Sequence, residues 1–500
     1  MIPELPPEIF EEIIGYLWDD KPALSACSLA SRILTTPSQK HIFACIVLRG
    51  PRELFDRQLY QHVYAMGGTS ANFLRLLGAS PDISAYVDCL QIIDVKPYLE
   101  GSEFSSSDDD PVYYNISPLS NTMELVAENA TPEDRKQVDT PEVGEAQDAE
   151  SVEPEESDDD DDEDDDDDDS RNDWLSDDKS LPLILPRLQN LKALIVDFVQ
   201  SWKNLSKEIR SSLLRVLQLP SFRYLEFTPF PIPLLTQAVH ENFKHLYVRA
   251  HCMSRRVKNV LVPGPGTSGP IYLDSLYASH TDDFLTFLES QPNCRFKTDR
   301  LRKLGLDVDG GQGGHSSTLT LLQNCSDTLE EFIFTPNSDR GLLIFDMSLI
   351  LGAHLSFSVI CQSPIAEYQE PIDISKLTSL RKLTVYATFE SEPLDNTFWW
   401  LSKFLRACSA PNRLLEDITI QVQYRFHKSQ DIDLQHWNDI SDALLSDYFP
   451  SLKWVHISIS SLVDLSHGKE IMEQLKASKF ITTLQSRRDL NVDFTFRYCW

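Results

Sequence analysis

Paired cysteines are the first feature that this sequence of 500 residues lacks. Its nine cysteines are scattered singly, and none belongs to a CxxC motif or to another close pair. That spacing does not indicate a disulfide framework. We therefore expect buried free thiols in a reducing compartment.

Long hydrophobic runs are also missing. No stretch of 18 apolar residues occurs, so the sequence predicts no membrane span and no membrane partner. The first residues carry no basic segment and are interrupted by Pro3, Pro6 and Pro7, unlike a secretory signal. We expect a cytoplasmic or nuclear protein.

Positive charge is scarce and forms no basic stripe. The formal net charge is −32, and residues 101–180 alone contribute −27 through 31 acidic and 4 basic side chains. The acidity thus belongs to one segment and says little about the rest. A chain that repels phosphate and lacks a basic stripe is not expected to bind nucleic acid.

The acidic segment 101–180 is a low-complexity insert. Residues 158–169 are an unbroken run of Asp and Glu, which repels itself and cannot bury surface, so we expect disorder. Three roles stay open for it. It is a solvated spacer, a patch at 155–169 that binds a basic partner such as a histone tail, or a substrate of an acid-directed kinase at Ser157 or Ser105–Ser107.

Catalytic and metal-binding motifs are lacking as well. Residues 264–269 are glycine-rich but have no following Lys, unlike a phosphate loop. Residues 307–318 begin like a calcium loop but end on Thr318, where a bidentate Glu is needed. The spacing of His240, His245, His251 and Cys252 fits no zinc site. We expect no enzyme activity, no catalytic residue, no metal site and no cofactor.

What the chain does contain, from residue 181 onward, is a repeat. Its unit is Leu or Phe, two residues of any type, an apolar residue, one of any type, and a further apolar residue. Copies follow one another at intervals of 21 to 37 residues, and the copies at Leu273/Leu276 and Leu355/Phe357/Val359 are degenerate. The full copies are Leu191/Leu194/Val196, Phe222/Leu225/Phe227, Phe243/Leu246/Val248, Leu301/Leu304/Leu306, Leu329/Phe332/Phe334, Leu380/Leu383/Val385, Leu415/Ile418/Ile420 and Leu452/Val455/Ile457.

Each copy reads as a short strand whose apolar residues, two apart, share one face. The residues between them would face solvent or the neighbouring edge, as in Lys192, Arg223, Lys244, Lys303, Glu330 and Lys382. Helix-like stretches separate the strands at 206–218, 283–290, 397–408, 438–449 and 469–476.

This alternation predicts an α/β fold, an irregular leucine-rich-repeat-like solenoid with a parallel sheet over residues 181–500. The alternative is an ordinary α/β domain with a parallel sheet. Residues 490–496 add a terminal strand. Residues 51–100 read as a linker and first capping repeat, and the strands expected at 90–95 and 191–198 would be neighbours across the insert.

Residues 1–50 read as three short helices that open at Pro6-Pro7, Pro22 and Pro37, where a missing N–H costs little. The first is amphipathic, with Ile9, Ile13 and Leu17 four residues apart. Three helices of this length make a poor core alone, so this segment must dock on something.

The same segment resembles an F-box. The resemblance rests on Leu5-Pro6 with Ile9, on Leu24 followed by Cys27-Ser28-Leu29, and on His41-Ile42-Phe43. Ile33 stands where many F-boxes carry an aromatic residue. The resemblance implies that residues 1–50 bind the Skp-type adaptor, and through it the cullin, of a ubiquitin ligase. It implies these contacts: Leu5, Pro6, Ile9, Ile13, Leu17, Leu24 and Leu29.

The sequence therefore predicts an SCF-type substrate receptor, in which residues 181–500 hold an unknown target protein. The alternative is a non-catalytic repeat scaffold whose N-terminal helices only cap the repeats.

Overall fold

The computed structural model of the chain describes most of its regular elements. The described residues are 6–49, 69–94, 174–198, 202–228, 231–249, 269–279, 284–285, 287–288, 294–308, 312–336, 373–389, 395–407, 410–424, 434–461 and 473–498. No helix among them is long and apolar enough to cross a membrane.

Three helices open the chain: α1 (Pro7–Gly15), α2 (Lys21–Ala30) and α3 (Arg32–Phe43). The prediction that a third helix opens at Pro37 is wrong, because α3 begins five residues earlier and Pro37 lies buried inside it. Ser31 is extended, with φ −155° and ψ 137°, so α2 stops there and a new helix can start at Arg32. Pro37 then removes one backbone hydrogen bond from α3.

Twelve parallel strands form one large sheet, in which neighbours in space follow one another along the chain. The strands are β1 (Cys45–Arg49), β2 (Cys89–Asp94), β3 (Ala193–Phe198), β4 (Tyr224–Thr228), β5 (His245–Arg249), β7 (Ser275–Ser279), β9 (Lys303–Val308), β10 (Glu331–Pro336), β11 (Lys382–Phe389), β12 (Asp417–Tyr424), β13 (Trp454–Ser461) and β14 (Asn491–Tyr498). A separate parallel pair joins β6 (Ile271–Tyr272) to β8 (Phe296–Lys297).

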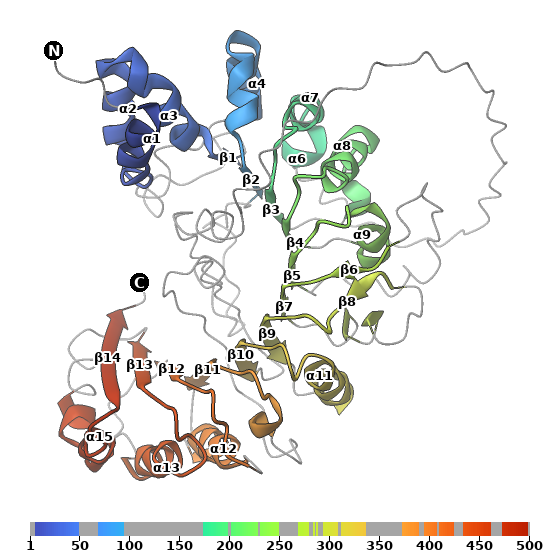
Figure 1. The fold of residues 1–500 in the computed structure, drawn as a ribbon. Helices are drawn as coiled ribbons and strands as arrows, with labels where there is room; N and C mark the ends of the chain where they lie inside the picture. Colours follow the sequence, from blue (N-terminus) through green and yellow to red (C-terminus); the bar gives the residue numbers. More distant parts are fainter. Residues whose placement is uncertain are drawn as a thin grey trace, which may run out of the picture.

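The sheet traces an arc with helices along its outer side, as Figure 1 shows. Helices α1–α3 stand at the β1 end, and β14 lies at the opposite end. The outer elements are α4 (Ser70–Ala79), η2 (Pro81–Tyr86), α6 (Trp174–Asp177), α7 (Leu181–Ile184), α8 (Lys207–Leu217), α9 (Ile232–Ala238), α11 (Gln312–Asn324), α12 (Asp395–Arg406), α13 (Leu434–Leu444) and α15 (Lys479–Gln485).

The core lies between the sheet and these helices. The second and fourth residues of successive strands stand in register, as Leu194 beside Leu225 and Val196 beside Phe227 do. Nearly all of these side chains are buried, each contributing about 1.5–3 kcal/mol. The predicted α/β fold with a parallel sheet is confirmed. The apolar positions of the full copies are buried in this core, whereas the copy at Leu355/Phe357/Val359 lies outside the described residues.

The predicted neighbours across the insert are also confirmed. Strand β2 pairs in parallel with β3, with Leu90 beside Leu194 and Ile92 beside Val196. The sheet thus starts at β1, inside the segment 1–50, and the expected boundaries at 51 and 181 do not delimit it. Of the insert 101–180, only residues 174–180 are described, so the expectation of disorder at 158–169 lies outside the described residues.

One charged residue stands directly before each strand of the large sheet from β2 to β13. Its carbonyl accepts hydrogen bonds from the next repeat, as Lys192 O does from the N–H groups of Arg223 and Tyr224 at 2.8 and 3.0 Å. The side chains of these charged residues are partly exposed, as expected for Lys192 and Glu330. Several of them form ion pairs with the charged residue of a neighbouring repeat. These pairs are Asp88–Lys192 (3.2 Å), Lys244–Asp274 (3.5 Å), Arg302–Glu330 (2.8 Å) and Glu416–Lys453 (2.8 Å).

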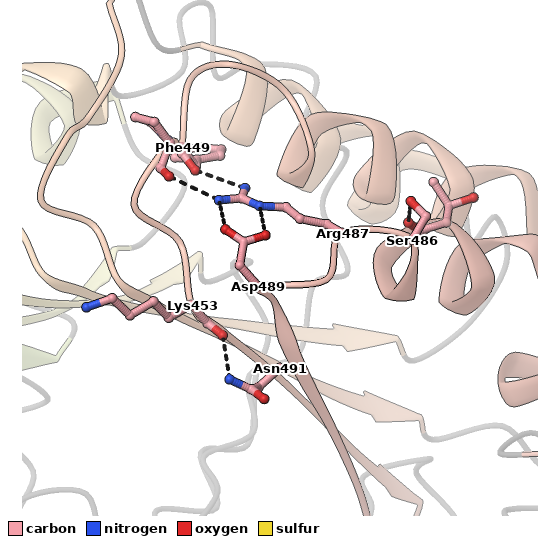
Figure 2. A network of polar contacts seen from close by, with 8 residues as sticks. Phe449, Lys453, Ser486, Arg487, Asp489 and Asn491 are labelled. Atoms are coloured by element: carbon pink, nitrogen blue, oxygen red, sulfur yellow. Dashed lines mark hydrogen bonds and ion pairs between the residues drawn. The ribbon is translucent and has the colours of Figure 1, made fainter.

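Polar side chains fix the turn that leads into the last strand (Figure 2). Arg487 donates to the carbonyls of Phe449 and Pro450 at 3.2 and 3.0 Å and pairs with Asp489. Asn491 donates its backbone N–H to Lys453 O at 2.8 Å. These contacts tie β14 to the loop before β13.

Candidate functional site

Helix α1 exposes one apolar face. Pro6 precedes it in an extended conformation, Pro7 occupies its first turn, and Glu8 favours its positive N-terminus. Ile9, Ile13 and Tyr16 recur at the i, i+4 and i+7 positions of one face, and all three are exposed, Tyr16 to 76%. Of the nine large hydrophobic side chains exposed in the described part of the chain, five lie between residues 9 and 33.

Helices α2 and α3 complete this N-terminal bundle. The Asp20 carboxylate caps α2 by accepting the N–H of Ala23 at 2.9 Å. Helix α3 packs against both α1 and α2, and Lys40 on α3 pairs with Glu11 on α1 at 2.8 Å. At the junction of α2 and α3, Leu29 is 88% exposed and Ile33 is half exposed. Apolar side chains left in water on a small bundle indicate a contact surface.

The expected adaptor contacts fall into three groups. Pro6, Ile9, Ile13 and Leu29 are exposed, and Leu17 is half-buried. Leu24 is fully buried, so it belongs to the core of the bundle with Ile14 and does not offer a contact surface. Leu5 lies outside the described residues.

Sequence reasoning missed Tyr16. Its spacing of seven residues from Ile9 and three from Ile13 is the signal that places it on their face.

A second surface is the inner face of the large sheet, which we define as the first, third and fifth residues of each strand. Where the structure describes them, these side chains point away from the outer helices. On β5 and β7 the rings of Tyr247 and Tyr277 stack at 4.6 Å with an interplanar angle of 3°. On β13 the rings of Trp454 and His456 stack at 5.8 Å with an angle of 2°.

A polar cluster lies on the inner face of β4, β5 and β7. The Tyr224 hydroxyl donates to Glu226 Oε2 at 3.1 Å, and His245 Nδ1 lies 2.8 Å from Ser275 Oγ. Burial, followed by the Glu226 carboxylate, raises the pKa of Tyr224 well above its usual range. Burial lowers the pKa of His245 to about 4. A base this weak is poorly suited to take a serine proton at neutral pH.

Two cysteines far apart in sequence meet on the inner face. Cys45 on β1 pairs in register with Cys89 on β2, and both are buried free thiols. The hydrogen bond with Cys45 and then burial raise the pKa of Cys89 well above its usual range. The same contact lowers the pKa of Cys45, so low thiol reactivity follows from the raised pKa for Cys89 alone. The expected buried free thiols are confirmed for Cys45, Cys89, Cys294 and Cys325, whereas Cys27 is only partly buried.

The described residues contain no group of three or more His, Cys, Asp and Glu side chains placed to hold a metal ion. His245 begins β5, as expected for a residue inside a repeat strand, and His251 and Cys252 lie outside the described residues.

A scan against protein-family models finds no match to this chain, and a search of curated proteins finds no significant relative.

Proposed function

We propose that this chain is a substrate-receptor subunit of an SCF-type cullin–RING ubiquitin ligase. Its N-terminal bundle is an F-box that binds a Skp-type adaptor, and its sheet is a leucine-rich-repeat-like solenoid that binds a target protein. The protein makes and breaks no bonds itself. It raises the effective concentration of target lysines near a recruited conjugating enzyme. This activity belongs in the cytoplasm or nucleus.

One observation carries the proposal: the apolar surface left exposed on α1 and at the α2–α3 junction. Ile9 and Ile13 lie on one face of α1, and Leu29 stands almost fully in water. The C-terminal end of α3 already contacts the body of the protein, since Phe43 packs against the main core. A bundle that only capped the repeats would have no need of a second, outward apolar surface.

The strand order supports the target-binding half. Sequential parallel strands, each followed by outer elements, give the chain an extended sheet face of the kind that repeat proteins use to bind partners. Among its described side chains, Trp454, Asn491 and Asp493 on β13 and β14 are exposed. The acidic run 155–169 is proposed to bind a basic partner or to act as a spacer.

A cell experiment tests the proposal. Tagged full-length chain should co-purify with the adaptor and the cullin, and Ile9→Ala combined with Ile13→Ala should lose both. The matched control is Leu183→Ala combined with Leu414→Ala, which removes two exposed leucines outside the bundle. Failure of the wild-type chain to bring down the adaptor would favour the alternative, a repeat scaffold without a link to ubiquitin ligases.

A further inference from the structure

The inner face of β12, β13 and β14 forms a polar patch at the C-terminal end of the sheet. The three strands pair in register, so Asp417, Trp454 and Asn491 stand in one row and Thr419, His456 and Asp493 in the next. Trp454 is the exposed aromatic side chain of this patch, with 45% of its surface in water. The nine inner-face positions hold two Asp residues and no Lys or Arg.

The carboxylates of Asp417 and Asp493 share one nearby cationic group, His456. His456 lies between them, with Nε2 3.8 Å from Asp417 Oδ2 and Nδ1 3.6 Å from Asp493 Oδ2. One imidazole carries at most one positive charge against two negative ones. The buried Oδ1 of Asp417 has no hydrogen-bond partner in the structure.

The lysines that flank the patch are engaged elsewhere. Lys382, beside Asp417 on β11, lies 3.9 Å from Glu331 Oε1. Lys453, directly before Trp454, lies 2.8 Å from Glu416 Oε1. Neither is paired with Asp417 or Asp493 by these contacts, so the patch keeps negative charge.

A further polar side chain on this face lacks a hydrogen-bond partner for its oxygen. Gln421 lies on the same face of β12, two inner positions beyond Asp417, and is only 8% exposed. Its buried Oε1 has no hydrogen-bond partner in the structure. A buried acceptor without a donor is costly, so Gln421 would gain free energy if its side chain turned outward to meet a donor from a bound segment.

We propose that this patch binds an arginine side chain carried by a segment of a partner protein. The guanidinium would stack on the part of the Trp454 indole that the His456 ring leaves uncovered and donate to the neighbouring carboxylate of Asp417. The Asp493 carboxylate, on the other side of His456, would add negative charge. A planar cation with five donors fits an aromatic ring flanked by carboxylates better than a point charge does. The role of this partner as the ubiquitination target rests on the proposed receptor function, whereas arginine binding does not.

The geometry of the patch is fixed before binding. The Arg487 contacts with Phe449 and Pro450 and the Asn491 contact with Lys453 hold β14 beside β13 (Figure 2). A surface built on paired strands loses little entropy when it binds.

The test follows the indole N–H of Trp454 by nuclear magnetic resonance in full-length chain labelled at tryptophan, with Trp454→Phe assigning the signal. The probe is the peptide acetyl-Gly-Ala-Arg-Ala-Gly-amide, and its control replaces arginine by uncharged citrulline. The arginine peptide should shift the Trp454 signal saturably, and the citrulline peptide should not. This readout is local, because it reports on the immediate surroundings of the Trp454 indole.

Variants complete the test. Asp417→Asn combined with Asp493→Asn should weaken the peptide about tenfold or more. Asp82→Asn combined with Glu473→Gln removes two exposed charges elsewhere and should change nothing. Equal shifts with both peptides, or no shift, would overturn the inference without needing any variant. Adaptor binding measured on the same preparations separates the two proposals, because the patch variants should retain it.

Discussion

The ring of Tyr277 on β7 occupies the space that a Cβ atom of residue 305 on β9 would fill. Gly305 is the neighbour of Tyr277 in the register, and the ring stacks on Tyr247 on its other side. The tyrosine pair on the inner face therefore depends on a glycine one strand away.

Gly305→Ala should destabilise the protein by about 1–3 kcal/mol, because the added methyl group overlaps the ring and must displace it. Gly78→Ala in α4 is the matched control, since nothing lies within 4 Å of its Cβ position. That control should be neutral or stabilising by up to about 1 kcal/mol. Denaturant unfolding measures both, and equal effects would contradict the close approach.

His245 should make stability fall with acidity. An unfolded histidine has a pKa of about 6.5, and burial lowers that of His245 to about 4. Between these values the unfolded chain binds a proton that the folded chain does not, so the free energy of unfolding falls as the pH is lowered. From pH 7 to pH 5 the wild type should lose about 2 kcal/mol more than His245→Gln. Equal losses in denaturant unfolding would mean that His245 is not held neutral.

The Arg302–Glu330 pair should contribute little despite its geometry. Two hydrogen bonds of 3.0 and 2.8 Å join the guanidinium to the carboxylate, and the hydrogen bond from Arg302 lowers the pKa of Glu330. Both side chains are largely exposed, so solvent screens them. A double-mutant cycle with alanine at each position should give a coupling of about 0.2–1 kcal/mol that shrinks at high salt. A coupling above about 2 kcal/mol would refute this estimate.

Leu24→Ala should lower the stability of the protein, whereas Leu29→Ala should leave it nearly unchanged. Leu24→Ala opens a cavity in the bundle and should cost about 2–5 kcal/mol if the bundle unfolds with the sheet. Leu29→Ala should change stability by less than about 0.5 kcal/mol, because its side chain is 88% exposed. Thermal unfolding distinguishes them, and a large loss of stability in Leu29→Ala would place that side chain in the core.

Local periodicity was sufficient to predict much of the fold. The spacing of Leu191, Leu194 and Val196 and of its later copies places apolar residues on one strand face, and the structure buries them. It also predicted that the strands on either side of the insert pair, as Leu90 and Leu194 do. The start of the third helix was predicted wrongly at Pro37, because proline is common in the first turn of a helix. The helix begins at Arg32, directly after the extended Ser31.

Contacts that depend on register could not be predicted in this way. Cys45 meets Cys89, and Tyr277 covers Gly305, only because two strands align residue by residue. The positions of Asp417, His456 and Asp493 belong to the same class, since each comes from a different strand. Sequence spacing carries no information on such lateral neighbours.

The affinity of the purified full-length chain for a purified Skp-type adaptor, measured by titration calorimetry, tests the central claim most directly. We predict that the wild type binds saturably. Ile13→Ala combined with Leu29→Ala should lower the affinity tenfold or more, which is about 1.4 kcal/mol of binding free energy per tenfold change. Leu183→Ala combined with Leu414→Ala should leave the affinity unchanged. No heat of binding from the wild type, or equal affinity in all three proteins, would contradict the account.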